Sequence, residues 1–310
     1  MRNKIVIGSR GSKLALIQAE LVANKIRQLT PHSEVSICRI VTQGERNPEV
    51  QLDHMERIGV FVKELEEALL VGKIDLAVHS LKDVPTEIPE GLHLLACPER
   101  ADPRDVLVSR YGKLPEMPSG ARIGTGSLRR SVQVLNLRPD FEVVGIRGNV
   151  DTRLRKVASG EIDGVILAAA AMKRLGWEEK VFEYLPLEQF LPAVGQGALA
   201  IEARDNDKEV EEVISHLNHL PTWQSVTAER AFLFALGGGC RAPIAALGTA
   251  SNGILKLDGM VASVAKRKIL RDSETGAPED AEKIGVKLAE RLLGMGASDF
   301  IAEARNHEGR

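Results

Sequence analysis

The feature of this sequence that most limits its fold is the alternation of strand-like and helix-like segments. Residues 4–8 have a strand pattern, and apolar residues at helical spacing follow as far as Leu29, with Ser12 as the expected N-cap. Another helical pattern covers residues 61–72, and a strand pattern follows it at 74–78. Helices that alternate with strands are typical of α/β layers, in which helices cover the faces of a sheet. We therefore predict an α/β fold.

Two interruptions of this pattern indicate that one domain is inserted into another. The first is the charged segment 97–104, which contains two prolines and after which strand and helix patterns begin again. The second is the segment 191–197, which leads into a strand pattern at 198–202. From Pro221 onward we expect a helix, two or three strands and a final helix. A chain of 310 residues has room for several domains. We predict domain 1 at 1–98 and 197–218, domain 2 at 103–193, and a small α+β domain 3 at 220–310.

Composition and charge exclude several classes of protein. The chain has 41 basic and 43 acidic residues, a formal net charge of −2, and 4% aromatic residues, which argues against a nucleic-acid partner. Its three cysteines are far apart and it has no HExxH motif, so we expect neither a disulfide scaffold nor a metal site. The most apolar window, residues 165–172, is too short to span a bilayer, and the N-terminus has no signal-peptide pattern. We expect a cytoplasmic protein without a membrane partner.

A basic cluster between residues 121 and 156 is the first candidate for a binding site. It contains eight basic and three acidic residues. Arg129 and Arg130 lie in the first turn of a predicted helix. Arg147 ends a strand pattern, and Arg153 lies in the first turn of the next helix. Arginines at helix N-termini oppose the helix dipole, which is reasonable if an anion binds between them. Carboxylate and phosphate are both candidate anions, although no P-loop motif occurs, and a solvated basic face is the alternative.

Two further patterns are candidates for chemistry. Lys82 and Asp83 follow the strand pattern at 74–78, and ligands of α/β proteins gather beyond the carboxyl ends of strands. Asp83 could act as an acid, a base or a cation stabiliser, or belong to a surface ion pair or turn cap. Cys240 follows three glycines, 237–239, which allow the backbone to approach a bound group closely. This cysteine is either an attachment point for a covalent group or a packed residue in a tight turn.

Several segments, in order along nearly the whole chain, resemble those of one enzyme family. They are GSRGSKLAL (8–16), FVKELEEALL (61–70), AVHSLKDVP (77–85), ERADPRD (99–105), IGTGSLRR (123–130), IRGNVDTRL (146–154), LPAVGQGALAIE (191–202), and TAERAFL with GGGCRAP (227–243). Together they make the chain similar to the porphobilinogen deaminases, also called hydroxymethylbilane synthases, of tetrapyrrole (haem and porphyrin) biosynthesis.

The resemblance implies a fold, a reaction and a cofactor. The reaction is that of a transferase, which joins four porphobilinogens head to tail with release of ammonia and then hydrolyses the product to hydroxymethylbilane. The implied cofactor is a dipyrromethane, assembled from two porphobilinogen units and held by a thioether to Cys240; no metal is implied. The implied protein is a monomer whose first two domains resemble the lobes of periplasmic binding proteins.

The resemblance also assigns roles to individual residues. Asp83 matches the family's catalytic aspartate. The residues that match cofactor-binding positions are Cys240, Lys82, Ser80, Thr125, Ser127, Arg129, Arg130, Arg147 and Gly148. Those that match substrate-binding positions are Arg10, Ser12, Arg147, Arg153, Arg174 and Gln196. Porphobilinogen carries an acetate and a propionate, so the basic cluster agrees with a product that accumulates carboxylates.

The sequence departs from the family pattern in three places. In the segment 53–60, His54 and Ile58 stand where lysines are common. Gly126 replaces a usual serine, and the glycine run before Cys240 is longer than the usual pair. The strongest alternative from another class is a two-lobed protein that binds a small polycarboxylate without catalysis. That alternative gives the GGGC motif no role.

Overall fold

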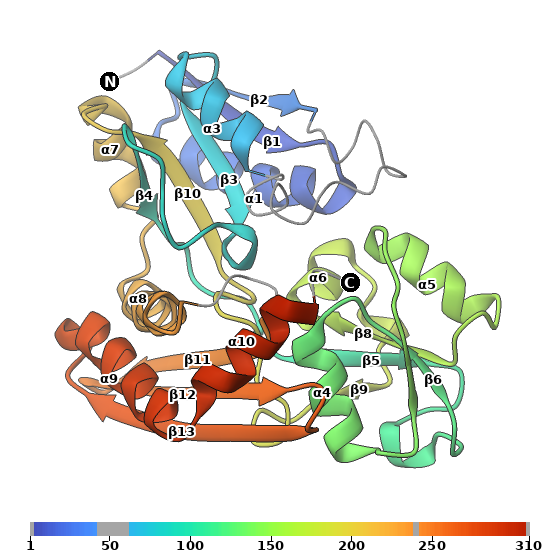
Figure 1. Ribbon diagram of the computed structural model, residues 1–310. Helices are drawn as coiled ribbons and strands as arrows, with labels where there is room; N and C mark the ends of the chain where they lie inside the picture. The colour runs from blue at the N-terminus through green and yellow to red at the C-terminus, as the bar shows by residue number, and fades with distance from the viewer. Residues whose placement is uncertain (1–2, 42–61, 238–241, 308–310) are drawn as a thin grey trace. The chain divides into compact units, whose positions relative to one another are not determined.

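The chain divides into two structural units, each made of two separate stretches of sequence. Figure 1 shows the computed structural model, which describes residues 3–41, 62–237 and 242–307. Unit 1 consists of Met1–Arg100 and Ala198–Trp223, and unit 2 of Ala101–Gly197 and Gln224–Arg310. The finer division into three domains, with the boundaries given above, stays a prediction. Each unit is described by itself below.

Unit 1 is built on one mixed five-stranded sheet. Its strands are β1 (Lys4–Arg10), β2 (Glu34–Ile40), β3 (Leu76–Ser80), β4 (Leu92–Ala96) and β10 (Leu199–Arg204), in the order β2-β1-β3-β10-β4. Strand β1 pairs in parallel with β2 and β3, whereas β10 runs antiparallel to β3 and β4. Because β1 and β3 are parallel neighbours, their carboxyl ends at Arg10 and Ser80 lie at the same edge of the sheet.

Helices cover both faces of this sheet. They are α1 (Lys13–Leu29), α3 (Lys63–Leu70), the 3-10 turn η2 (Leu81–Asp83) and α7 (Lys208–Ser215). Alternation along the strands assigns side chains to the two faces: Ile5 and Ile7 join the core beneath α1 and α7, and Val6 packs against the core beneath α3. The backbone N–H of Ala15 donates to Ser12 Oγ at 3.2 Å, which confirms the predicted N-cap.

The first part of unit 2 has the same layered plan. Its strands are β5 (Asp105–Ser109), β6 (Arg122–Gly124), β7 (Glu142–Val144), β8 (Gly164–Ala168) and β9 (Glu183–Tyr184), in the order β7-β6-β8-β5-β9. The helices are α4 (Leu128–Leu137), α5 (Val150–Ala158) and α6 (Ala169–Leu175), with 3-10 turns η3 (Leu114–Glu116) and η4 (Glu178–Lys180). Helix α4 packs through Val134 on one face, and α5 and α6 pack through Val157 and Met172 on the other. The two sheets confirm the predicted α/β class.

The last part of unit 2 is an antiparallel sheet with helices on one face. Its elements are α8 (Leu220–Ala235), β11 (Ile244–Ser251), β12 (Ile254–Ser263), β13 (Lys268–Gly276), η5 (Pro278–Asp280), α9 (Ala281–Gly294) and α10 (Ala297–His307). Phe232 of α8 and Leu288 of α9 pack on this sheet with Leu257 of β12. On the opposite face, Met260 packs with Val132 of α4. The predicted small α+β part is confirmed.

Some details differ from what the sequence pattern indicates. Residues 165–170 have the apolar pattern of a buried strand, but β8 ends at Ala168, and α6 begins at once because the alanines 169–171 favour a helix. Helix α10 was not predicted, because polar residues separate its apolar positions, among them Phe300 and Ile301. Within the described ranges, none of the helices has the length and apolar character needed to cross a membrane.

Candidate active site

Five predicted site residues lie at the carboxyl-terminal edge of the unit 1 sheet. Arg10 ends β1, and Ser12 caps the helix that follows it. Ser80 ends the neighbouring strand β3, and Lys82 and Asp83 lie in the turn η2 directly after it. Because β1 and β3 are parallel, both strand ends contribute to one edge, where α/β proteins bind ligands. The Asp83 side chain is exposed there and Lys82 is half-buried.

Hydrogen bonds fix the chain at the start of the turn η2. The side chains of Ser80 and Gln18 of α1 are linked, with Gln18 Nε2 2.9 Å and Gln18 Oε1 3.2 Å from Ser80 Oγ. The backbone N–H of Leu81 donates to the carbonyl of Ala198 at 3.1 Å. The backbone that carries Asp83 is therefore tied both to a helix and to the chain just before β10.

The other described site residues lie in unit 2, at the corresponding edge of its sheet. Strands β6, β7 and β8 are parallel, and each is followed by predicted residues: Thr125, Ser127, Arg129 and Arg130 after β6, Arg147, Gly148 and Arg153 after β7, and Arg174 after β8. Ser127 is the N-cap of α4, and its Oγ accepts from the backbone N–H of Arg130 at 3.4 Å. The backbone N–H of Ser127 in turn donates to Thr125 Oγ1 at 3.1 Å.

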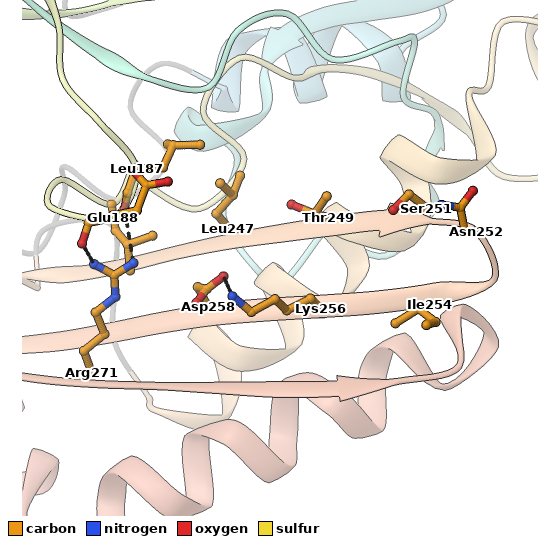
Figure 2. A pocket seen from close by; sticks show the side chains of 11 residues that line it. Leu187, Glu188, Leu247, Thr249, Ser251, Asn252, Ile254, Lys256, Asp258 and Arg271 are labelled. Atoms are coloured by element: carbon orange, nitrogen blue, oxygen red, sulfur yellow. Dashed lines mark hydrogen bonds and ion pairs between the residues drawn. The ribbon is translucent and has the colours of Figure 1, made fainter.

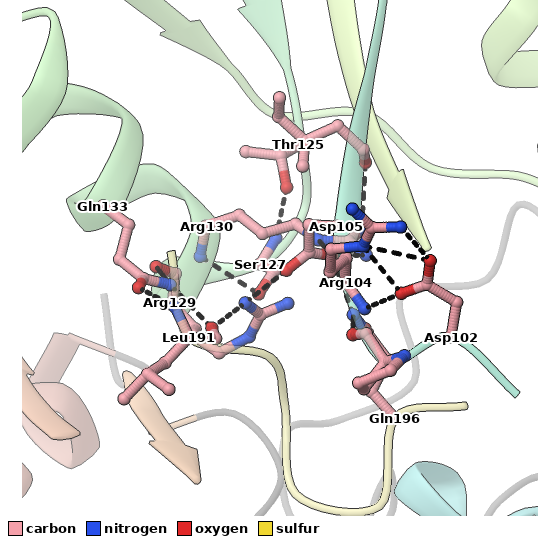
Figure 3. A network of polar contacts seen from close by, with 12 residues as sticks. Asp102, Arg104, Asp105, Thr125, Ser127, Arg129, Arg130, Gln133, Leu191 and Gln196 are labelled. Carbon is pink, nitrogen blue, oxygen red and sulfur yellow. Dashed lines mark hydrogen bonds and ion pairs between the residues drawn. The ribbon is translucent and has the colours of Figure 1, made fainter. Parts of the chain in front are cut away.

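Arg129 and Arg130 share one buried carboxylate, Asp105, at the start of β5 (Figure 3). Arg129 Nη1 lies 2.7 Å from Asp105 Oδ2, and Arg130 Nη2 lies 2.7 Å from Oδ1. Gln196, which is also buried, donates from Nε2 to the same Oδ1 at 3.0 Å. The anion expected between the two arginines is therefore supplied by the protein itself. Binding of a ligand by these arginines stays a prediction.

The charges of this network are strongly coupled. Burial by itself raises the pKa of the Asp105 carboxyl, but the two guanidinium groups and the Gln196 amide outweigh it and lower the pKa to about 2. Burial lowers the pKa of Arg129, and Asp105 opposes that shift while Arg130 adds to it. One negative charge therefore neutralises one of two positive charges, and the network keeps a formal excess of +1.

Arg129 and a further arginine, Arg174, fix the segment 191–197, which carries Gln196. At its start, Arg129 Nη1 donates to the carbonyl of Leu191 at 2.7 Å. At its end, Arg174 Nη2 donates to the carbonyl of Gly197 at 2.8 Å. A chain segment held at both ends presents its side chains in a defined geometry, which agrees with a binding role for this segment.

Three arginines at this edge have no carboxylate partner among the described residues: Arg147, Arg153 and Arg174. Arg153 Nε donates to the carbonyl of Gly148 at 2.9 Å. Burial lowers the pKa of Arg153, and repulsion from Arg130 adds to the shift. Burial also lowers the pKa of Arg174, to about 10. Guanidinium groups that have lost hydration without gaining a carboxylate favour the binding of an anion.

The departures from the family pattern fall partly outside the described residues. Cys240 and the segment 53–60 are among the residues that the structure does not describe. Gly126 is described, and a Cβ atom there would lie 2.9 Å from the carbonyl oxygen of Ile146. A serine at this position would require the chain segments after β6 and β7 to separate. Gly148 has a φ of +101°, which favours glycine over other residues.

A groove on the C-terminal sheet is separate from these residues (Figure 2). It lies on the face opposite α9 and α10, and its basic side chains already have partners. Arg271 binds the carbonyls of Leu187 and Glu188, and Lys256 Nζ lies 2.9 Å from Asp258 Oδ2. None of the predicted site residues lines this groove, so it is not part of the candidate active site. Over the described ranges, His, Cys, Asp and Glu form no group of three suited to a metal ion.

Comparison with models of known protein families shows to which family the chain belongs. The model described as "Porphobilinogen deaminase, dipyromethane cofactor binding domain" matches residues 5–212, and the model described as "Porphobilinogen deaminase, C-terminal domain" matches residues 223–294. The chain belongs to the porphobilinogen deaminase family.

Individual relatives agree with the family over nearly their full length. The chain is 50% identical to a porphobilinogen deaminase of Geotalea daltonii over 97% of this chain and 95% of the relative. It is 48% identical to a porphobilinogen deaminase of Geobacter sulfurreducens over 99% and 96%. Among solved structures, a putative methionine-binding lipoprotein of Bacillus subtilis is 11% identical with a TM-score of 0.43, over 70% of this chain and 90% of that one.

Reasoning from the sequence missed Asp105 and Gln18. Asp105 stands in the segment ERADPRD, and an acidic residue directly before the apolar run 106–108 is a signal that could have found it. Gln18 lies on the buried face of α1, and nothing in its local sequence indicates a contact with Ser80.

Replacement of Asp105 by asparagine should destabilise the protein strongly, because it leaves two buried guanidinium groups without a counter-charge. We expect Asp105→Asn to lower the free energy of unfolding at pH 7 by about 3–5 kcal/mol, measured by urea denaturation. Folding lowers the pKa of Asp105 from 3.8 to about 2, so its stabilising contribution is complete above about pH 4 and is lost as the pH falls toward 2. The difference between the two proteins should shrink over that interval.

Asp140→Asn is the matched control. Asp140 Oδ2 lies 2.8 Å from Arg138 Nη2 at the surface, where solvent screens the ion pair. We expect a small loss of stability for this variant. Equal losses in the two variants would contradict the importance given to burial of Asp105.

Proposed function

We propose that this protein is a hydroxymethylbilane synthase. It joins four porphobilinogens head to tail, releases four ammonia molecules and hydrolyses the product to hydroxymethylbilane. The observation that carries the proposal is that this member of the porphobilinogen deaminase family has three arginines, Arg147, Arg153 and Arg174, that no carboxylate of the described residues contacts. Each substrate brings an acetate and a propionate, and arginine forks bind carboxylates through paired hydrogen bonds.

The residues of the unit 2 edge suit a dipyrromethane cofactor. Two porphobilinogen units carry four carboxylates, which match the hydroxyl and guanidinium donors found after β6 and β7. We propose that the cofactor is attached to Cys240 and held by Ser80, Lys82, Thr125, Ser127, Arg129, Arg130, Arg147 and Gly148. When bound, the cofactor supplies the pyrrole end to which new units are added.

We assign the incoming substrate to a second set of residues. These are Arg10 and Ser12 in unit 1, with Arg147, Arg153, Arg174 and Gln196 in unit 2. Arginines would orient the ring through its acetate and propionate, because one charged hydrogen bond contributes about 1.5–3 kcal/mol. The bound carboxylates would also restore the interactions that the partly buried guanidinium groups of Arg153 and Arg174 lost with water.

We propose that Asp83 performs the proton transfers. Its carboxyl group protonates the substrate amine as the carbon–nitrogen bond breaks, so that ammonia leaves and a methylene-pyrrole cation forms. The resulting carboxylate stabilises this cation. It also stabilises the cation formed when the next pyrrole carbon attacks, and it accepts the proton that this carbon loses. At ~4 Å and an effective dielectric constant of ~20, the attraction is about 4 kcal/mol, or roughly a thousandfold in rate.

We further propose that the protein acts as a monomer in the cytoplasm. The resemblance to the family supports both statements, and three widely separated cysteines agree with a reducing compartment. Light scattering coupled to size-exclusion chromatography should give the mass of one chain.

The intact mass of the purified protein tests the cofactor. We expect a covalent excess over the sequence mass that equals one dipyrromethane unit, and we expect Cys240→Ser to lose it. Cys97→Ser is the matched control and should keep the added mass. A wild-type chain without added mass, purified from a host that makes tetrapyrroles, would support the binding-protein alternative.

The variant Asp83→Asn tests the catalytic role assigned to Asp83. We expect Asp83→Asn to lower kcat by about a thousandfold, because the amide neither donates the proton nor stabilises the cations. We expect Arg153→Ala to lower kcat/KM by about ten- to a hundredfold, because it removes one carboxylate contact. Steady-state assays of hydroxymethylbilane formation measure both values. Comparable losses in the two variants would overturn the role of Asp83.

A further inference from the structure

A buried pair of ionisable residues lies behind the unit 1 edge and has no part in the chemistry above. His79 Nε2 lies 2.8 Å from Glu202 Oε2, and the two side chains are 4% and 0% exposed. His79 is the next-to-last residue of β3, and Glu202 lies on the neighbouring antiparallel strand β10. Ionisable side chains are seldom buried this completely, so the pair requires an explanation.

The hydrogen bond joins two residues that lie diagonally across from each other on the neighbouring strands β3 and β10. In the ladder between β3 and β10, His79 lies opposite Ala200, and Glu202 lies opposite Ala77. The Glu202 side chain therefore spans two residue pairs of the ladder to contact the imidazole ring. It fastens the last residues of β3 to β10 just before Ser80, where the strand ends.

The end of β3 is thus held from both faces of the sheet. Ser80 follows the alternation of the strand to the α1 face, where the side chain of Gln18 binds it. His79 and Glu202 lie on the α3 face, which carries the alternate residues of both strands. Each face supplies one side-chain contact to the two residues that precede the turn carrying Asp83.

Stability alone does not account for the pair. Glu202 Oε1 is buried and accepts no hydrogen bond from the described residues. A second carboxyl group, on Glu66 of α3, lies close enough to interact with both members of the pair. Burial and the Glu202 carboxylate raise the pKa of Glu66, and they outweigh His79, which lowers it. Exchange of a buried ionic pair for apolar residues is often neutral or stabilising. A pair retained in this setting is expected to have a role besides folding.

We propose that His79 and Glu202 are positioning residues for the turn that carries Asp83. Glu202 orients the imidazole ring, and the hydrogen bond between them fixes the end of β3. The turn then presents the Asp83 carboxyl group at a constant position. This inference rests on the catalytic role of Asp83 in the proposed function. It assigns the pair a contribution to the rate in addition to any contribution to folding.

The double variant His79→Leu/Glu202→Leu separates the two contributions. It removes both members together and leaves no unpaired buried charge, so we expect its melting temperature to match or exceed that of the wild type. We expect kcat for porphobilinogen to fall about ten- to a hundredfold, because small displacements of a catalytic group have effects of this size. KM should change by less than about twofold, because both side chains are buried away from the surface at which substrate would bind. Circular dichroism and intact mass check the fold and the cofactor.

His93 and Asp205 provide the matched control in the same unit. His93 lies on β4 and Asp205 directly follows β10; His93 Nδ1 lies 2.9 Å from Asp205 Oδ1, and this pair is exposed. We expect His93→Leu/Asp205→Leu to keep the wild-type kcat.

A buried double variant with wild-type kcat, beside an active wild type, would overturn this inference alone. A wild type that forms no hydroxymethylbilane would overturn the proposed function, and the inference with it. If the double variant does not fold, Glu202→Gln and Glu202→Leu are compared. Glutamine can still accept the hydrogen bond from the ring, so its kcat should stay within about threefold of wild type, whereas leucine should lose about tenfold. Equal kcat values in these two variants would overturn the inference.

Discussion

The ion pairs between Asp105 and the two arginines of α4 join three pieces of the chain into the unit 2 edge. Asp105 begins β5, Arg129 and Arg130 lie in the first turn of α4, and Gln196 comes from the segment 191–197. Because these groups are buried, each contact is stronger than it would be in water, and the loss of one partner is costly. This network holds the other residues of the unit 2 edge in place, and within it Asp105 neutralises the charge of one of the two arginines.

The same rule of α/β architecture places the candidate residues in both units. Site residues follow the carboxyl ends of parallel strands, β1 and β3 in unit 1 and β6, β7 and β8 in unit 2. The unit 1 edge carries a carboxyl group suited to proton transfer, Asp83, on a turn held from both faces of the sheet. The unit 2 edge carries the excess of guanidinium groups. Porphobilinogen chemistry requires both kinds of group, because it generates cations from substrates that carry carboxylates.

Local patterns in the sequence were sufficient for the α/β class, for the N-cap at Ser12 and for the placement of Asp83 after a strand. Contacts between residues that are far apart in the sequence could not be predicted from local patterns. His79 and Glu202 are separated by 123 positions, and Asp105 precedes Arg129 by 24. Only the folded sheets show that these residues meet. The same limit explains why the arginines of α4 were expected to require an external anion, when the chain itself supplies one.

The most direct test of the account is incubation of the purified wild-type protein with porphobilinogen, with ammonia and product measured together. We predict four ammonia molecules for each hydroxymethylbilane formed, and uroporphyrin I after acid treatment and oxidation. Saturable binding of porphobilinogen without release of ammonia would contradict the account. That result would favour a polycarboxylate-binding protein.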